Sequence, residues 1–405
     1  MKKGWEVKKL GEVCDFQGGS QPPKSNFIFE PRKGYVRFLQ IRDFGSDKNI
    51  TYIPESKKNR YCNEEDVLLG RYGASVGKVL INKAGAYNVA IMKTIPNLKL
   101  LNKRYFFFYL LSNEFQMPLS KVASRSAQDG FSKDDIFGFQ ILVPSLPEQK
   151  RIVAILDEAF ATIDKAKENT EKNLQNAKDL FQSELNSIFA KKGKDWEEKP
   201  LGEITTKIGS GATPRGGNAS YKSEGISLIR SMNVHDGYFK EKNLAFIDDK
   251  QAKELSNVTL EENDVLLNIT GASVARCCVV PKEYLPARVN QHVSIIRPKK
   301  EIMNPLFLNL LLTSRYYKDQ LLKTGEQGAT RQAITKAQLQ SFVIYYPTLK
   351  DQRKIVVNMN TLSAQTQKLE SIYQKKLNDL EGLKESILEK AFKGELKTTR
   401  ALIEA

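Results

Sequence analysis

The sequence has little histidine and cysteine. Only two histidines, His235 and His292, occur in 405 residues, so most acid–base mechanisms would depend on carboxylates, lysine or tyrosine. The cysteines show no C-x-x-C spacing, which argues against a zinc site or a disulfide framework and predicts reduced, packed thiols. The four cysteines are Cys14, Cys62, Cys277 and Cys278.

Long apolar runs are also missing. No stretch approaches the ~20 uninterrupted apolar residues of a membrane span, and the opening segment MKKGWEVKKLGEV has no apolar signal-peptide core. We therefore expect a cytoplasmic protein. The sequence contains no Asn-Pro-Pro-Tyr or Asp-Pro-Pro-Tyr methyltransferase motif, no Gly-x-Gly-x-x-Gly cofactor loop, no true Walker motif and no helicase set, which predicts a noncatalytic chain.

Positive charge is in excess. The chain has 63 Lys and Arg against 47 Asp and Glu, for a formal net charge of +16. In a cytosolic chain this balance favours an anionic partner, and nucleic acid is the usual one. A basic surface without a partner is the alternative. The length is typical of two or three domains that each bury a core.

The chain repeats itself along its whole length. W-E-V-K-K-L-G-E-V from Trp5 recurs as W-E-E-K-P-L-G-E-I from Trp196, and D-V-L-L-G-R-Y-G-A-S-V from Asp66 recurs as D-V-L-L-N-I-T-G-A-S-V from Asp264. The offset rises from 191 residues at the tryptophans to 203 between V-P-S-L-P-E-Q-K-R-I-V and Y-P-T-L-K-D-Q-R-K-I-V. Ordered matches with small insertions indicate an internal duplication.

Each copy divides into a globular part and a helical part. Residues 1–147 and 193–347 contain short β-rich runs between Gly, Pro and Asn turns, with a helix around residues 105–112 whose aromatic side chains we assign to the core. Residues 148–192 and 348–405 lack proline and place apolar residues at alternating spacings of three and four, which predicts long helices. Because a narrow apolar seam needs a partner, we expect these helices to pair as an antiparallel coiled coil.

This organisation predicts an α+β fold, in which two similar α/β domains are joined by two long helices in a pseudo-two-fold internal duplication. The charge fits this division, because residues 1–147 and 193–347 carry net charges of +9 and +4, whereas the helical segments carry 0 and +3. We expect the globular parts to face the anion and the helices to face protein. A helix pair ~60 Å long would act as a ruler.

The segment G-A-S-V-G-K at residues 73–78 superficially resembles a phosphate loop. Its spacing differs from that of a Walker motif, and the second copy, G-A-S-V-A-R at residues 271–276, lacks the second glycine. A tight turn that points Lys78 or Arg276 at a DNA phosphate is the better interpretation. A purely structural turn is the alternative.

Residue types that read DNA bases lie in the turn-rich parts of both copies. Arginine suits guanine, and asparagine or glutamine suits adenine. Lys133 and Lys336, matched at an offset of 203, are expected to position phosphates. The alternative for each candidate is a solvated loop residue. In the first copy the candidates are Gln21, Lys24, Arg42, Arg71, Tyr72, Arg125 and Gln128. In the second copy they are Thr213, Arg215, Arg230, Asn233, Asn268, Asn290, Gln291, His292, Arg331 and Gln332.

Together these motifs resemble the specificity subunit of a Type I DNA restriction–modification system. The resemblance covers essentially the full length. The second copy departs from the pattern at Lys350, where the first copy has Pro147. The motifs that carry the resemblance are the W-x-x-x-x-L-G-E openings, the D-V-L-L…G-A-S-V blocks, P-S-L-P-E-Q-K-R-I from Pro144, P-T-L-K-D-Q-R-K-I from Pro347, and the closing A-F-K-G-E-L from Ala391.

The resemblance implies a division of labour. Two target-recognition domains, residues 1–147 and 193–347, would each read half of a split DNA sequence. The helical spacers 148–192 and 348–405 would separate them and dock two modification (methyltransferase) subunits. Restriction (endonuclease and translocase) subunits would join the complex, and S-adenosylmethionine and ATP would bind to partner subunits, with no cofactor or metal on this chain. An autonomous DNA-modifying enzyme and a coiled-coil adaptor without a DNA role are the alternatives.

The two copies differ most in the loops between their shared blocks. SQPPKSNFIFEPRKG in the first copy corresponds to GATPRGGNASYKSEG in the second. Different loops predict two different half-sites and hence an asymmetric target. The helix pair predicts half-site centres roughly one DNA turn apart, ~34 Å.

Overall fold

The computed structural model describes residues 4–124, 130–326 and 333–396. The chain divides into two compact units. Unit 1 comprises Met1–Glu171 and Lys375–Ala405, and unit 2 comprises Lys172–Gln374. Each unit therefore draws on both helical segments of the sequence.

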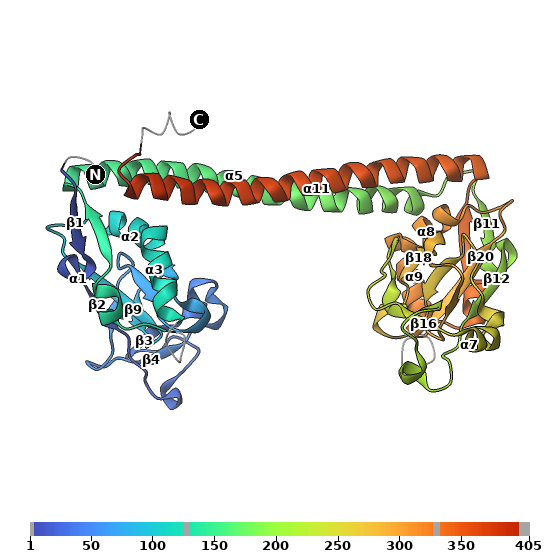
Figure 1. Ribbon diagram of the computed structural model, residues 1–405, viewed down its shortest axis with the longest axis horizontal. Coiled ribbons are helices and arrows are strands. Elements are labelled where there is room, and N and C mark those ends of the chain that lie inside the picture. Colours follow the sequence, from blue (N-terminus) through green and yellow to red (C-terminus); the bar gives the residue numbers. More distant parts are fainter. Residues whose placement is uncertain (1–3, 125–129, 327–332, 397–405) are drawn as a thin grey trace. The chain divides into compact units, whose positions relative to one another are not determined.

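Unit 1 contains two four-stranded sheets and a two-stranded ribbon (Figure 1). The first sheet is antiparallel throughout and has the order β2 (Cys14–Gly18), β9 (Ile91–Pro96), β6 (Leu68–Gly70), β7 (Val79–Leu80). The second sheet has the order β4 (Tyr52–Pro54), β3 (Tyr35–Leu39), β8 (Gly85–Tyr87), β5 (Tyr61–Cys62), with β3 and β8 parallel. The ribbon pairs β1 (Glu6–Lys9) with β10 (Gln140–Val143).

Unit 2 repeats this architecture. Its antiparallel sheet has the order β12 (Thr205–Ser210), β20 (Val293–Pro298), β17 (Val265–Asn268), β18 (Cys277–Val279). A second sheet has the order β16 (Ala245–Ile247), β13 (Ile226–Ile229), β19 (Ala287–Val289), with β13 and β19 parallel. The ribbon pairs β11 (Glu197–Pro200) with β21 (Val343–Tyr346), and a hairpin joins β14 (Val234–His235) to β15 (Tyr238–Phe239). The predicted duplication and mixed fold class are confirmed.

The D-V-L-L blocks form the strands β6 and β17, and their unbroken apolar runs are buried on both faces. Leu68 and Leu69 belong to two different core clusters of unit 1. In unit 2, Leu267 and Leu266 likewise face different clusters. A strand covered on both sides needs apolar residues at successive positions, which explains why these blocks do not alternate with polar residues.

A helix follows each antiparallel sheet. Asn102 caps α2 (Lys103–Leu111), and Asn304 caps α8 (Pro305–Thr313), because each side-chain oxygen accepts from two backbone amides of the first turn. The predicted aromatic core of α2 is confirmed by buried Phe106 and Phe108. The remaining helices are α1 (Leu10–Val13), α3 (Asn113–Ala123), α4 (Lys133–Phe137), α6 (Leu201–Ile204), α7 (Asp249–Glu254), α9 (Arg315–Glu326) and α10 (Lys336–Ser341).

Two long helices, α5 (Leu146–Lys191) and α11 (Leu349–Phe392), each begin in one unit and end in the other. Within unit 1, Lys167 of α5 pairs with Glu381 of α11, and Asp164 pairs with Lys384. Residue numbers fall along one helix as they rise along the other, so this pairing is antiparallel. Figure 1 shows α2 beneath this helical part of unit 1.

The helical part of unit 2 also packs on its globular part. Leu185 and Phe189 of α5 share one core cluster with Val356 and Met359 of α11. Phe189 also contacts Phe307 of α8, with ring centroids 5.4 Å apart. The seam expected from the three-and-four spacing thus supplies core residues on both helices.

The helix ends differ from the sequence-based boundaries. Helix α5 begins at Leu146, two residues before the expected start at 148, because Pro147 is tolerated in a first turn, where its missing amide has no helical partner. Helix α11 begins at Leu349 and ends at Phe392, so it covers only part of the segment 348–405 that was expected to be helical. Gly394 adopts φ +75°, the left-handed conformation that ends many helices.

All four cysteines are free and buried. Burial raises the pKa of Cys14 to about 12 and that of Cys278 to about 12, which keeps both sulfurs as neutral thiols. These positions agree with the prediction of packed, reduced thiols. Across residues 4–124, 130–326 and 333–396, no helix is both long and apolar enough to cross a bilayer.

Candidate nucleic-acid interface

In unit 1, three loops meet at one edge of the antiparallel sheet: the loop after β2, the loop between β6 and β7, and the loop before β9. Strands β2 and β6 end at this edge, at Gly18 and Gly70, while β9 and β7 begin there, at Ile91 and Val79. Because neighbouring strands run in opposite directions, the end of one strand lies beside the start of the next. The loops that carry the candidates Gln21, Arg71, Tyr72 and Lys78 are therefore neighbours, although they are far apart in the sequence.

The turn at residues 88–90 links two of these loops. Asn88 donates from Nδ2 to Oε1 of Gln21 at 2.6 Å. Its own Oδ1 accepts from the amide of Ala90 at 2.8 Å, and the Ala90 carbonyl accepts from the amide of Arg71 at 2.9 Å. Gln21 and Arg71 are thus held beside each other through Asn88 and Ala90.

Arg71 is held in a defined orientation. Its Nε donates to the carbonyl of Phe131 at 2.7 Å, and its guanidinium carbon lies 4.9 Å from the ring centroid of Tyr72. Tyr72 is exposed and forms an isolated antiparallel bridge with Gly130. A fixed guanidinium plane is what bidentate contact with a guanine edge requires.

The equivalent edge of unit 2 carries a chain of polar side chains. Strands β12 and β17 end there, and β20 and β18 begin there. Thr213 donates its hydroxyl to Oε1 of Gln291, and Nε2 of Gln291 lies 3.2 Å from Nε2 of His292. Nδ1 of His292 lies 2.5 Å from the hydroxyl oxygen of Thr270. An accepting Nε2 and a donating Nδ1 satisfy all these contacts with a neutral imidazole.

Asn88 and Asn290 hold the same turn in the two copies. Oδ1 of Asn290 accepts from the amide of His292 at 3.1 Å, as Oδ1 of Asn88 accepts from Ala90. Asn290 is buried. These bonds assign Asn290 to the turn that supports the interface, whereas it was proposed from the sequence as a base reader.

Asn233 and Asn268 are also buried and bonded to backbone. Oδ1 of Asn233 accepts from the amide of Arg230 at 3.1 Å, and its Nδ2 donates to the carbonyl of Lys240 at 2.9 Å. Nδ2 of Asn268 donates to the carbonyl of Ser231 at 2.8 Å. These contacts favour a structural role. Arg230 is half-buried, donating to the Asn243 carbonyl at 2.5 Å.

The other candidates lie on exposed turns or at helix starts. Lys133 and Lys336 are the first residues of α4 and α10, and Nζ of Lys133 lies 3.7 Å from a carboxylate oxygen of Asp15. In the same turn, the Ser132 hydroxyl and amide lower the pKa of Asp135. Exposed or half-exposed in turns are Lys24, Arg42, Lys78, Arg215 and Arg276.

Four candidates, Arg125, Gln128, Arg331 and Gln332, lie outside the described residues. The first described residue after each pair forms an isolated antiparallel bridge with a residue at the interface edge of its own unit. Gly130 bridges Tyr72, and Ala333 bridges Thr270.

Sequence reasoning missed one residue at each edge, Asn88 in unit 1 and Thr270 in unit 2. Thr270 occupies the position of Tyr72 at the offset of 198 residues that relates the D-V-L-L blocks. Projecting each candidate through the repeat would have found it. Asn88 matches Asn290 at an offset of 202 residues, but its role in the turn depends on tertiary contacts.

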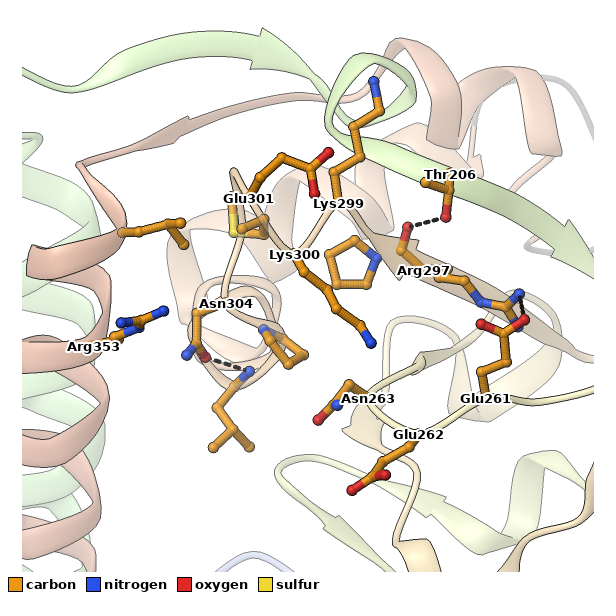
Figure 2. Close-up of a pocket in the computed structure, with 15 residues that line it drawn as sticks. Thr206, Glu261, Glu262, Asn263, Arg297, Lys299, Lys300, Glu301, Asn304 and Arg353 are labelled. Carbon is orange, nitrogen blue, oxygen red and sulfur yellow. Dashed lines mark hydrogen bonds and ion pairs between the residues drawn. The ribbon is translucent and has the colours of Figure 1, made fainter.

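A pocket of about 510 Å³ lies at the opposite end of the unit 2 sheet, near the starts of α8 and α11 (Figure 2). Arg297 lines it and pairs with Asp264, the acidic residue of the second D-V-L-L block, at 2.7 and 2.8 Å. Asp264 is fully buried, and its carboxylate oxygens accept from Arg297 and from the amide of Glu261 at 2.8 Å, as a buried carboxylate requires. Among the described residues the pocket has no histidine or cysteine, and no group of three His, Cys, Asp or Glu could hold a metal.

One protein family matches both copies. Its sequence model, described as the Type I restriction modification DNA specificity domain, matches residues 2–175 and 193–379. The chain belongs to this family. The two matched stretches of the specificity family coincide with the two copies of the duplication, and the resemblance inferred from the motifs is confirmed.

Relatives span nearly the whole chain. The specificity subunit of the Type I restriction enzyme EcoBI from Escherichia coli is 25% identical over 97% of this chain and 86% of that protein. The specificity subunit of the enzyme MjaVIII from Methanocaldococcus jannaschii is 24% identical over 97% and 93%.

Solved structures share the specificity fold. A chain in a structure of a type I R-M system has a TM-score of 0.77 and 20% identity, covering 98% of this chain and 99% of that chain. The HsdS subunit from Thermoanaerobacter tengcongensis has a TM-score of 0.61 and 20% identity, covering 97% and 98%. These similarities support the fold class of the whole chain.

Proposed function

We propose that this chain is the DNA-reading subunit of a Type I restriction–modification complex and recognises an asymmetric, bipartite sequence. The observation that carries the proposal is the pair of equivalent sheet edges. The same turn supports both edges, but one presents Gln21, Arg71 and Tyr72, and the other presents Thr213 and Gln291. One scaffold with different side chains suits two different half-sites. The recognition domains would be residues 1–147 and 193–347.

The candidates divide by chemistry. Arg71, with its fixed guanidinium, is suited to guanine, and Gln21 and Gln291 are suited to adenine. Lys78, Arg276, Lys133 and Lys336 lie on turns or helix starts and would contact phosphates, which position the protein without reading sequence.

The catalytic activities would reside in partners. The family is the specificity component, and the pocket near α8 offers neither a nucleophile–histidine pair nor a metal cluster among the described residues. Methyltransferase subunits would bind S-adenosylmethionine and dock on the long helices, whose net charges of 0 and +3 suit protein contact. Restriction subunits would bind ATP.

The proposal is tested by DNA binding and methyl transfer. The purified chain should bind duplex DNA with an affinity that falls steeply as salt rises, because phosphate contacts release counterions. It should transfer no methyl group from labelled S-adenosylmethionine unless modification subunits are added. Turnover by the chain alone would favour an autonomous enzyme, and the absence of DNA binding at low salt would favour a protein adaptor.

A further inference from the structure

Gln149 makes three hydrogen bonds at the first turn of α5. Its Nε2 donates to the carbonyls of Leu100 and Pro144, both at 2.8 Å. Its Oε1 accepts from the amide of Asn102 at 2.8 Å. The side chain is 0% exposed. No surface role is therefore open to this glutamine.

Gln352 repeats the arrangement at the first turn of α11. Its Nε2 donates to the carbonyls of Ile302 and Pro347, both at 2.9 Å, and its Oε1 accepts from the amide of Asn304 at 2.8 Å. This side chain is also 0% exposed. Both glutamines lie in matched blocks of the repeat, and all three contacts are kept although Pro147 and Glu148 of the first block are Lys350 and Asp351 in the second.

Each glutamine connects three elements of its own unit. In unit 1, Pro144 follows the ribbon strand β10, Gln149 lies in α5, and Asn102 caps α2. The amide therefore ties the long helix to the ribbon that precedes it and to the helix beside the sheet. We call Gln149 and Gln352, with their three backbone partners each, the helix joints.

The chemistry of the joints requires a primary amide. Two backbone carbonyls each need a donor, and one backbone amide needs an acceptor. Only the primary amide of asparagine or glutamine offers two donor hydrogens and an acceptor oxygen from one side chain. An apolar or charged side chain of similar length in place of the glutamine would leave at least one of these buried backbone groups without a hydrogen-bond partner, which is costly in a protein interior. A joint with those bonds broken would let the domain shift on its helix.

We propose that Gln149 and Gln352 are positioning residues that set the length of the nonspecific spacer in the DNA target. This inference rests on the proposed function, in which two domains read two half-sites. Adding one base pair to the spacer moves a half-site by ~3.4 Å and rotates it by ~35° about the DNA axis. A domain held on its helix by three hydrogen bonds cannot follow a half-site that is displaced in this way. A domain that has lost these bonds can shift and bind the displaced half-site.

The test uses the full complex of this chain with its modification subunits. Once the wild-type target is defined, labelled methyl transfer is measured on duplexes with the cognate spacer and with spacers one base pair shorter or longer. The variants are Gln149→Met and Gln352→Met, which keep side-chain length but lose the polar contacts. Leu119→Ala, at a buried position of α3 away from the joints, is the control for lost stability.

The proposal predicts that each glutamine variant raises the ratio of off-spacer to cognate methylation by about tenfold, the scale expected for buried groups left unpaired. The bases required in each half-site should not change, and Leu119→Ala should leave the ratio at the wild-type value. If one variant fails to fold, the other decides. Unchanged ratios in a folded variant, or relaxed base requirements at constant spacer, would overturn the proposal. A wild-type complex without a bipartite target would instead refute the proposed function.

Discussion

Asn88 and Asn290 form the same turn in the two copies, whereas the residues that follow them differ. Val89 and Ala90 follow the first, and Gln291 and His292 follow the second. The asparagine oxygen fixes the backbone, and the neighbouring side chains provide the surface chemistry. At the residue scale, the interface therefore separates residues that shape the loops from residues that face the ligand.

Gly211 is one of the shaping residues. A Cβ atom there would lie 1.7 Å from the carbonyl oxygen of Val289, which is backbone and cannot move aside. We predict that Gly211→Ala displaces the turn of Asn290 and weakens DNA binding by about 1 to 3 kcal/mol, the usual range for broken buried contacts. The effect is measured by fluorescence anisotropy with the cognate duplex.

Gly209 provides the matched control for this change. It lies two residues earlier, in β12, and a Cβ atom there would meet nothing within 4 Å. Gly209→Ala should bind DNA like the wild type. Equal losses in the two variants would show that the close approach at Gly211 is unimportant for the interface.

Substitutions at Arg71 and Lys78 test the difference between a residue that reads a base and a residue that contacts a phosphate. Arg71→Lys keeps the charge but loses the planar fork held by Phe131 and Tyr72, so we expect discrimination at one base pair to fall by about 1 to 3 kcal/mol. Lys78→Ala should weaken binding to all sequences similarly and reduce the slope of log affinity against log salt by about 1.

Binding to a panel of duplexes with single base changes, each measured over a range of salt concentrations, distinguishes these outcomes. A uniform loss for Arg71→Lys, or a base-specific loss for Lys78→Ala, would reverse the assigned roles.

At the scale of elements, each globular part is anchored by the end of a helix that comes from the other copy of the repeat. Phe392, at the end of α11, packs against Tyr105 and Tyr109 of α2, with centroid distances of 5.1 and 5.9 Å. Phe189, at the end of α5, packs against Phe307 of α8 at 5.4 Å. The closing A-F-K-G-E-L motif thus contributes a core residue to unit 1.

We predict that Phe392→Ala lowers the free energy of unfolding of unit 1 by about 3 to 5 kcal/mol, because it removes a fully buried aromatic ring. Hydrogen exchange should show lost protection in α2 and unchanged protection in α8. Phe189→Ala should give the opposite pattern. Val357→Ala, at a site of α11 that is 62% exposed, should change neither. Loss of protection in both units from either phenylalanine variant would contradict this account.

The sequence was informative about elements and less so about single side chains. The repeat and the three-and-four spacing predicted two copies and two long antiparallel helices, because these patterns extend over many residues. The burial of Asn268 was not predictable, since its backbone partner Ser231 lies 37 residues away in the sequence. Gln149 was part of a recognised motif, yet its three bonds depend on where the loop before α2 lies.

At the scale of the whole molecule, the excess charge of +16 has a defined distribution. The globular segments 1–147 and 193–347 hold +9 and +4 of it. We expect the first recognition domain to make more phosphate contacts than the second, so charge-neutralising changes there should reduce the affinity for DNA more. The helices contribute little charge and are available for protein partners.

The central claim is that two different recognition domains read one split target. The most direct measurement is methylome sequencing of a host that carries this chain with its modification subunits, compared with the same host without this chain. The account predicts methylation, dependent on this chain, at an asymmetric sequence of two unlike half-sites separated by a spacer of fixed length. A palindromic or continuous methylated sequence, or a pattern that does not change when the chain is removed, would contradict it.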